Sequence, residues 1–354
     1  MITEPLRLEG TELKPPLIIA GPCSAESEEQ VLKTAKGLAA GGIKIFRAGI
    51  WKPRTRPGSF EGIGSAGFPW LRRVKEETGM AVAIEVATAQ HVDEALKSGV
   101  DIVWVGARTT ANPFAVQEVA EALRGVNIPV FIKNPINPDI ELWIGAFERL
   151  NRAGVTQLGA IHRGFSSLNG SIYRNQPLWE IPVRFKEMFP EMPLINDPSH
   201  ISGKRALLFQ VARKALTLGF DGLIIESHCD PDSALSDKDQ QVKPDDLIAS
   251  LSQLMKEISE ISEGEDAEEL EELRSRIDSC DHDLLVTLVN RMMVSEKIGK
   301  YKKKKKMSVV QNSRYNEVLE SRLKEGKGIG LSEDFVEGLF KYIHQESVNR
   351  QREE

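Results

Sequence analysis

The sequence is poor in cysteine and has no long apolar run. Its 354 residues include only three cysteines, Cys23, Cys229 and Cys280. So sparse and odd a set provides no disulfide framework and indicates a reducing compartment. No apolar run approaches the roughly 20 residues that cross a bilayer, and the first ten residues lack the apolar segment of a signal peptide. We therefore expect a cytoplasmic protein with no membrane partner.

The chain also lacks an excess of basic residues. Lys and Arg number 46 against 52 Asp and Glu, which gives a net charge of −6. A mildly acidic chain is a poor candidate for general nucleic-acid binding, although a local cationic pocket would still suit anionic small substrates. Hydrophobic residues make up 41% and charged residues 28%, a mix that argues against wholesale disorder.

Short apolar segments alternate with helix-like segments between residues 15 and 260. Each segment is apolar throughout, as expected for strands buried on both faces of a parallel sheet. Eight such β/α units predict a closed (β/α)8 TIM barrel over residues 1–260. An open doubly wound sheet is the alternative, because repeats alone do not show closure. The eight predicted strands are 17–20, 43–48, 82–86, 102–105, 130–133, 156–161, 194–196 and 222–226.

The composition changes after residue 259. Residues 261–267 form an acidic linker, and beyond it the strand patterns end. Apolar residues then recur every three or four positions from Leu270 to Met292, as on one long helix, and two shorter helices are predicted near 313–324 and 332–350. Because so little chain is left to cover the apolar seam, we predict an all-α three-helix domain over 268–354 that dimerises. A homodimer and a tetramer both remain open.

Cationic side chains follow the carboxyl ends of the predicted strands, where the active sites of such barrels lie. Like charges on one rim repel one another unless anions fill the site, and arginine suits phosphate and carboxylate oxygens. We therefore expect substrates with more than one phosphate or carboxylate; separate surface salt bridges are the alternative. The six cations are Arg47, Lys52, Arg54, Arg108, Lys133 and Arg163.

Four candidate metal ligands follow other strand ends and the last loop. A thiolate, an imidazole and two carboxylates suit a divalent transition metal such as Mn²⁺, Fe²⁺, Co²⁺ or Zn²⁺. The spacings are long, so a merely structural role for the buried cysteine also stays open. The four residues are Cys23, His200, Glu226 and Asp237.

Together these segments resemble the type Iβ subclass of 3-deoxy-D-arabino-heptulosonate-7-phosphate (DAHP) synthases. The resemblance covers residues 15–260 and rests on the motifs at Gly21–Ser24, Arg47–Thr55, Gly106–Arg108 and Asp197–His200. It implies a transferase of the shikimate pathway that condenses phosphoenolpyruvate with erythrose 4-phosphate. A related synthase that uses arabinose 5-phosphate is the nearest alternative, and the motif ending at Thr55 favours the four-carbon aldose.

The resemblance also implies roles for individual residues. One divalent metal per barrel would polarise the aldehyde as a Lewis acid, and its ligands would be Cys23, His200, Glu226 and Asp237. Phosphoenolpyruvate would be bound by Arg108, Lys133 and Arg163, with Arg47 and Lys52 nearby. The aldose phosphate would be bound by Arg54 and Thr55. Glu85 would move a proton or position a water, or would instead pair with Arg47 or Lys133.

Two motifs depart from those of many relatives, which carry Lys-Arg-Gly and Glu-Arg-Gly. This chain has Asn134 and Pro135 after Lys133 in the first motif, and His162 before Arg163 in the second. The cations are kept, so the departures affect the detailed phosphate geometry rather than the class of reaction.

The C-terminal residues 265–354 resemble chorismate mutases of the all-helical AroQ class. The resemblance implies the rearrangement of chorismate to prephenate without a cofactor, by side chains that bind its carboxylates and ether oxygen. The residues from one chain would be Arg291, Lys302, Arg314, Ser347 and Gln351, and Arg274 would come from the partner chain. Tyr315 stands where many relatives have Glu, which leaves recognition of the substrate hydroxyl open.

Three interpretations of this domain remain open: an active mutase, a regulatory and dimerising module, and a nucleic-acid-binding tail. The lysine run at Lys302–Lys306 suggests the third, and the acidic chain argues against it. We further expect the effector prephenate, or chorismate, bound at Arg274, Arg291 and Arg314 to inhibit the barrel. Fusion without any coupling is the alternative.

Overall fold

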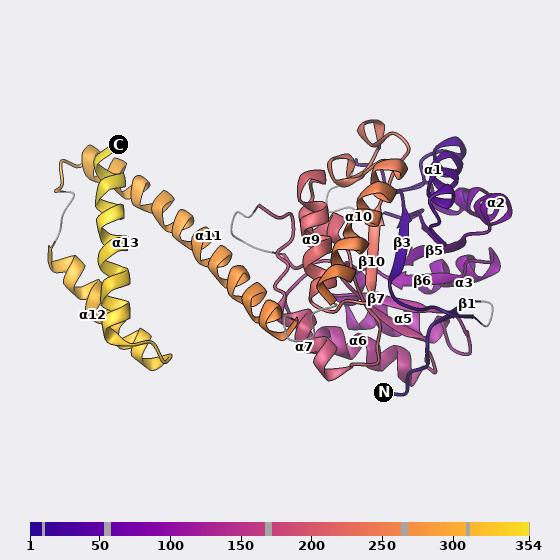
Figure 1. Ribbon diagram of the computed structural model, residues 1–354, viewed down its shortest axis with the longest axis horizontal. Coiled ribbons are helices and arrows are strands. Elements are labelled where there is room, and N and C mark those ends of the chain that lie inside the picture. Colours follow the sequence, from indigo (N-terminus) through magenta and orange to yellow (C-terminus); the bar gives the residue numbers. More distant parts are fainter. Residues whose placement is uncertain (9–10, 53–57, 167–171, 263–267, 309–311, 354) are drawn as a thin grey trace. The chain divides into compact units, whose positions relative to one another are not determined.

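In the computed structural model, eight parallel strands close into a barrel (Figure 1). The last strand, β10, pairs with the first, β3, which confirms the predicted barrel and excludes an open sheet. The structure describes residues 1–8, 11–52, 58–166, 172–262, 268–308 and 312–353. The strands are β3 (Leu17–Gly21), β4 (Ile45–Arg47), β5 (Ala81–Val86), β6 (Ile102–Val105), β7 (Val130–Lys133), β8 (Leu158–His162), β9 (Leu194–Asn196) and β10 (Gly222–Glu226).

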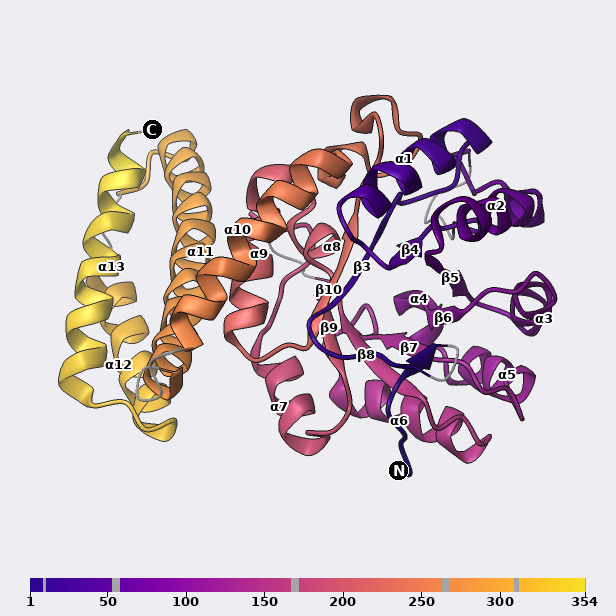
Figure 2. The same ribbon diagram turned by 45° about the vertical axis from the view of Figure 1, so that its right-hand side comes forward.

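Helices surround the strands, as Figure 2 shows. Several begin at a capping side chain that accepts a backbone N–H, such as Ser27, Thr88 and Asp139. The helices of the barrel are α1 (Glu28–Ala40), α2 (Phe68–Thr78), α3 (Ala89–Lys97), α4 (Ala107–Thr110), α5 (Pro113–Ala122), α6 (Ile140–Arg152), α7 (Glu180–Met188), α8 (Pro198–Ser202), α9 (Arg205–Thr217) and α10 (Pro244–Ser262). Short 3-10 turns lie at η1 (Gly64–Gly67), η2 (Pro231–Ser233) and η3 (Lys238–Gln240).

A small N-terminal hairpin closes the amino end of the barrel. Its strands are β1 (Arg7–Leu8) and β2 (Thr11–Glu12), and Leu6 beside them is 1% exposed. Leu6 packs with residues of the barrel interior such as Leu17 and Ile102. Burial of one such leucine stabilises the fold by about 1.5–3 kcal/mol. The sequence patterns do not predict this hairpin, because two-residue strands are too short to show a period.

The chain divides into two compact units, Met1–Arg276 and Ile277–Glu354. The C-terminal helices are α11 (Glu268–Lys304), α12 (Asn312–Gly328) and α13 (Glu333–Glu353). Most of the predicted linker, residues 263–267, lies outside the described residues. Among the described residues, each helix is too short or too polar to cross a bilayer.

Two glycines shape the packing of the last two helices and the turn between them. Gly326 is inside α12, and a Cβ there would lie 2.6 Å from Cγ2 of Val336. Glycine at this position therefore lets α13 pack closely on α12. Gly330, with φ +91°, makes the actual turn in a conformation that favours glycine.

Candidate active sites

The four predicted metal ligands lie together at the carboxyl end of the barrel. Cys23 follows β3, Glu226 ends β10, and Asp237 precedes η3. The ligand atoms of these three residues all lie within 4.8 Å of one another. His200, in α8, places Nε2 3.7 Å from Oε1 of Glu226. The structure thus brings together side chains that are separated by up to 214 residues in sequence.

This set of donors fits a divalent transition metal. Burial and the carboxylate of Glu226 raise the pKa of the Cys23 thiol to about 12. The thiol donates to Oδ2 of Asp237 over 3.3 Å, so its proton lies between the sulfur and that carboxylate. A bound cation would replace this proton and balance the thiolate and both carboxylates.

Asp197 orients the imidazole of this site. Its Oδ2 lies 2.8 Å from Nδ1 of His200 and accepts from Nζ of Lys133 over 2.9 Å. Burial alone would raise the pKa of Asp197, but the charges of His200 and Lys133 lower it well below its usual value. A carboxylate behind a metal-binding histidine commonly fixes the ring and its tautomer. Its place directly after β9 is the signal that could have identified Asp197 from the sequence.

Arg47 is a buried cation with unused donors. It is 1% exposed, and Nη2 donates to Oε1 of Glu226 over 3.1 Å. Its Nε and Nη1 are buried and have no hydrogen-bond partner among the described residues. Buried donors without a partner are costly, so these two N–H groups favour an anionic ligand at this point.

Trp104, which the sequence patterns do not single out, lies close to two of the predicted cations. Cζ of Arg47 is 5.2 Å and Nζ of Lys133 5.7 Å from its ring centroid. Its Nε1 donates to Oε2 of Glu85 over 2.9 Å. Burial raises the pKa of Glu85, but Lys133 and Lys52 outweigh burial and lower it, so the residue is a carboxylate. An apolar strand that contains one tryptophan is typical of ordinary core, so the sequence does not indicate that Trp104 lies at the site.

Arg163 is held in place by two asparagines. Its backbone N–H donates to Oδ1 of Asn134 over 2.7 Å, and Nη1 donates to Oδ1 of Asn175 over 2.8 Å. Burial lowers the pKa of Arg163 to about 10, and the charges of Arg174 and Arg108 act in the same direction. The asparagine that departs from many relatives therefore positions a cation rather than removing one.

His162 lies away from the mouth. It is fully buried, its Nε2 bonds to the carbonyl oxygen of Pro177 over 2.7 Å, and its Nδ1 lies 3.0 Å from Nδ2 of Asn196. The ring also contacts Trp179 and Phe220 in the layer between strands and helices. Burial lowers its pKa to about 3, so it is neutral. This departure from the relatives changes packing rather than the charge of the mouth.

The remaining predicted residues of the barrel differ in position. Nζ of Lys52 donates to the carbonyl oxygen of Cys23 over 3.0 Å, which places it beside the ligand set. Arg108 is exposed on α4, directly after β6. Arg54 and Thr55 lie outside the described residues.

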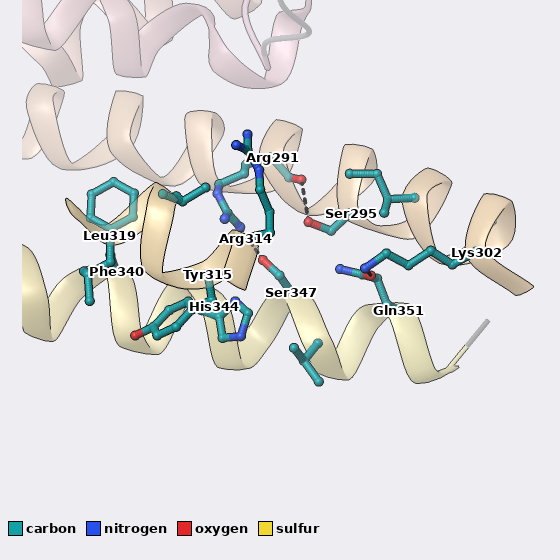
Figure 3. Close-up of a pocket in the computed structure, with 13 residues that line it drawn as sticks. Arg291, Ser295, Lys302, Arg314, Tyr315, Leu319, Phe340, His344, Ser347 and Gln351 are labelled. Carbon is teal, nitrogen blue, oxygen red and sulfur yellow. Dashed lines mark hydrogen bonds between the residues drawn. The ribbon is translucent and has the colours of Figure 1, made fainter. Parts of the chain in front are cut away.

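A second site lies among the C-terminal helices (Figure 3). A pocket of about 340 Å³ is lined by α11, α12 and α13. Five predicted residues line it, namely Arg291, Lys302, Arg314, Ser347 and Gln351. Nη1 of Arg291 donates to Oγ of Ser347, and Nζ of Lys302 donates to Oε1 of Gln351 over 3.1 Å. The side chain of Arg274 lies outside the described residues.

The charged side chains that line this pocket are all positive. Its described lining includes three cations and no carboxylate. Burial, assisted by the charge of Arg322, lowers the pKa of Arg291. Gly299 lets the helices approach, because a Cβ there would lie 2.9 Å from Cα of Gln351. The result is a preformed site for a small molecule with more than one anionic group.

Comparison with known proteins agrees with both sites. The model of the DAHP synthetase I family matches residues 7–263, and the model of chorismate mutase type II matches residues 273–352. A phospho-2-dehydro-3-deoxyheptonate aldolase of Thermotoga maritima is 33% identical over 241 residues, which are 68% of this chain and 69% of that protein. A 2-dehydro-3-deoxyphosphooctonate aldolase of Geobacter sulfurreducens is 28% identical and covers 68% of this chain and 92% of its own.

Solved structures show the same relationship. A crystal structure of a Thermotoga maritima phospho-2-dehydro-3-deoxyheptonate aldolase (DAHP synthase) matches with a TM-score of 0.62 at 32% identity, over 69% of each chain. These findings confirm both resemblances predicted from the motifs. The chain belongs to the DAHP synthetase I family, carries a chorismate mutase type II domain C-terminal to the barrel in sequence, and is a bifunctional enzyme of aromatic biosynthesis with both activities.

Proposed function

We propose that the barrel condenses phosphoenolpyruvate with erythrose 4-phosphate to give DAHP and phosphate. The observation that carries the proposal is the convergence of Cys23, Glu226 and Asp237 within 4.8 Å beside the buried cation Arg47. A site of this kind offers a place for a metal and, next to it, donors for an anion. Both are needed to join an enol phosphate to an aldehyde.

Residue roles follow from the contacts. The ligands would hold one divalent transition metal (Mn²⁺, Fe²⁺, Co²⁺ or Zn²⁺), which when bound makes an aldehyde more electrophilic. The unused donors of Arg47 would bind phosphoenolpyruvate together with Lys133, Arg163 and Arg108. Lys52 would stabilise the negative charge that develops as water adds and phosphate leaves. The Glu85 carboxylate would orient that water, while Nε1 of Trp104 donates a hydrogen bond to Oε2 of the same carboxylate and holds it in place.

The choice of aldose phosphate is part of the same proposal. Relatives named for an eight-carbon product, such as the Geobacter sulfurreducens protein, also match the barrel. The higher identity to the Thermotoga maritima protein and the Lys52–Thr55 motif support the four-carbon substrate. Parallel assays of the full chain with erythrose 4-phosphate and arabinose 5-phosphate test this choice, and turnover of the second aldose alone would reverse it.

The role of the metal is tested in the full chain, in which the chorismate mutase activity serves as the control. Chelation should abolish the synthase reaction, and a divalent transition metal should restore it. Cys23→Ala should lose the synthase reaction and keep chorismate turnover, since the residue lies in the barrel alone. A chelated protein with full synthase activity would disprove the four-ligand assignment.

For the helical domain we propose that Arg291 and Arg314 bind the carboxylates of chorismate, while Lys302 and Gln351 bind its ether oxygen as that bond breaks. The Lys302–Gln351 contact of 3.1 Å places a donor and an amide together at one end of the pocket. Arg291→Ala should lower chorismate turnover at least about a hundredfold, because it removes a charged contact to the substrate and the donor to Oγ of Ser347. Synthase activity of the variant should stay at the wild-type level. Chorismate turnover equal to that of the wild type would refute the assignment.

We also propose that this domain forms a homodimer, to which Arg274 of each chain contributes at the other's pocket. An apolar groove of about 390 Å³ on the domain supports this. Its lining includes Leu285 at 61%, Val289 at 59% and Tyr342 at 80% exposure, values typical of side chains that a partner covers. Sedimentation of the full chain distinguishes a monomer, a dimer and a tetramer.

Finally, we propose that prephenate bound in the mutase pocket inhibits the barrel. The three cations that line the pocket suit a dianion, and prephenate is the product of the reaction proposed for this pocket. Inhibition requires that prephenate favour one arrangement of the chain over another, and linkage then requires barrel ligands to change prephenate affinity. Titration of synthase activity with prephenate should show inhibition in the wild type and a loss of sensitivity in Arg291→Ala. Equal sensitivity of the two proteins would exclude this route.

A further inference from the structure

Two aromatic rings lie flat against each other at the carboxyl end of the barrel. Trp51 follows β4 and directly precedes Lys52, and His91 lies in the first turn of α3. The centroids of the two rings are 3.8 Å apart and their planes differ by 3°. Trp51 also makes an edge-to-face contact with Phe68 at the start of α2, with centroids 5.6 Å apart and planes inclined by 74°. The residue before a proposed catalytic lysine is thus held by rings from two helices.

The imidazole of this stack is itself fixed by backbone contacts. The backbone N–H of Ala87 donates to Nδ1 of His91 over 3.3 Å, and the backbone N–H of His91 donates to Oγ1 of Thr88 over 3.2 Å. Because Nδ1 accepts a hydrogen bond, the ring proton lies on Nε2. Burial lowers the pKa of His91, and the charges of Glu94 and Glu85 oppose this only in part, so the ring is neutral near pH 7. One tautomer of an uncharged ring therefore faces the indole.

Backbone hydrogen bonds lie on both sides of the tryptophan. The N–H of Lys52 donates to the carbonyl oxygen of Glu61 over 2.8 Å, and the N–H of Gly64 donates to the carbonyl oxygen of Ile50 over 2.8 Å. These bonds set the path of the backbone, and the stack holds the indole between them. Because a tryptophan has only two side-chain torsions, a ring held on its face also restricts the backbone that carries it.

The side chain of Lys52 reaches from this backbone to the metal site. Its Nζ donates to the carbonyl oxygen of Cys23 over 3.0 Å, next to the thiol of the candidate ligand set. Gly49 leaves room for it, because a Cβ there would lie 2.9 Å from Cδ of Lys52. A lysine carries its charge on a flexible four-carbon stem, so the ammonium is placed only as well as the backbone from which the stem starts.

We propose that His91 is a positioning residue for the synthase reaction, because its ring holds Trp51 and thereby the backbone from which Lys52 reaches the metal site. The inference rests on the synthase function proposed above, in which this lysine stabilises the negative charge that develops. His91 then affects the rate of the reaction through Trp51, without contacting a substrate. A role in packing alone leads to a different expectation, a loss of stability with unchanged kinetic constants.

Three substitutions of His91 in the full chain separate the ring from its hydrogen bond. His91→Ala removes both, His91→Gln keeps an acceptor for the N–H of Ala87 without a ring, and His91→Phe keeps a flat ring without the acceptor. The alanine and glutamine variants should lower kcat of the synthase reaction about tenfold, and His91→Phe should stay within about twofold of the wild type. The KM for phosphoenolpyruvate should change less than about twofold in all three, because Lys52 acts on charge that develops after binding.

Two controls accompany the kinetic measurements. Titration of the metal-stripped chain with Co²⁺ should give the wild-type dissociation constant in every variant, which shows that the barrel is folded and its metal site complete. Gln90→Ala is the matched variant: this exposed neighbour donates to Oε1 of Glu94 over 2.7 Å, and its loss should change neither kcat nor KM.

Two kinetic results would overturn the inference. One is a wild-type kcat in His91→Gln, and the other is a loss of kcat in His91→Phe as large as in His91→Ala. A weaker affinity for Co²⁺ that accounts for the whole fall in rate would overturn it as well. A wild-type chain that forms no DAHP would instead refute the synthase function itself, which separates the two failures.

Discussion

Nη1 of Arg174 donates to Oδ1 of Asp237 over 2.9 Å and to Oε1 of Gln240 over 2.8 Å. Gln240 in turn donates to Oε2 of Glu226 over 2.6 Å. One arginine therefore holds both carboxylates of the candidate metal site, one directly and one through an amide. Asp237 has φ 48°, a conformation that few non-glycine residues adopt, so these contacts also hold a ligand in a strained backbone.

Arg174→Ala should therefore weaken metal binding about 10- to 100-fold, the usual effect of losing a contact behind a metal ligand. The measurement is a titration of the full, metal-stripped chain with Co²⁺, followed by the absorption of the cobalt–thiolate bond. Arg213→Ala, which breaks a surface pair with Glu257, is the control and should bind Co²⁺ as the wild type does. An unchanged dissociation constant in Arg174→Ala would show that the arginine only covers the site.

Trp104→Phe should raise the KM for phosphoenolpyruvate. The change keeps an aromatic ring near Arg47 and Lys133 and removes the hydrogen bond to Glu85. The loss of a hydrogen bond to a buried charge predicts a decrease of about tenfold or more in kcat/KM.

Trp143→Phe provides the matched comparison for Trp104. Trp143 is equally buried and its Nε1 donates to the carbonyl oxygen of Ile132 over 3.2 Å, outside the mouth. This variant should lose stability and keep its kinetic constants. Similar kinetics in both tryptophan variants would mean that Trp104 contributes only packing.

The stability of the barrel should depend on pH through His162. Its pKa is lowered from 6.5 to about 3 in the folded chain, so below pH 6.5 the unfolded chain binds a proton that the folded chain does not. The free energy of unfolding should therefore fall as the pH drops from 6.5 toward 3, by up to about 1.4 kcal/mol per pH unit from this residue. Urea unfolding from pH 7 to pH 5 should show the stability difference between wild type and His162→Gln shrinking as the pH falls. Parallel curves would contradict this account.

A charge on the exposed apolar groove should dissociate the predicted dimer. Leu285→Glu with Val289→Glu places two carboxylates on a face whose side chains are about 60% exposed in one chain. Sedimentation should then show a monomer, and chorismate turnover should fall because Arg274 no longer reaches a partner's pocket. Glu320→Lys on the exposed side of α12 should change neither property. A dimer that survives the double change must use another surface.

The barrel could be predicted from the sequence because its strands are largely apolar and polar residues stand at or soon after their carboxyl ends. Four of the eight predicted strands, namely 102–105, 130–133, 194–196 and 222–226, have the bounds of the structure. Arg174 could not be predicted as a site residue, since it follows no strand and reaches Asp237 only through the fold. His162 and Arg163 are adjacent in sequence, yet one packs behind the sheet and the other lies at the mouth. Composition does not distinguish the directions of two neighbouring side chains.

Within the described part of the chain, Leu6 and the hairpin that follows it cover the amino end of the barrel, so a ligand would enter from the carboxyl end. Arg47, at 1% exposure, lies deep below that entrance. We therefore expect a ligand at Arg47 to bind before one held nearer the rim and to leave after it. The order of binding would then depend on a contact made at the opposite end of the barrel by the first few residues of the chain.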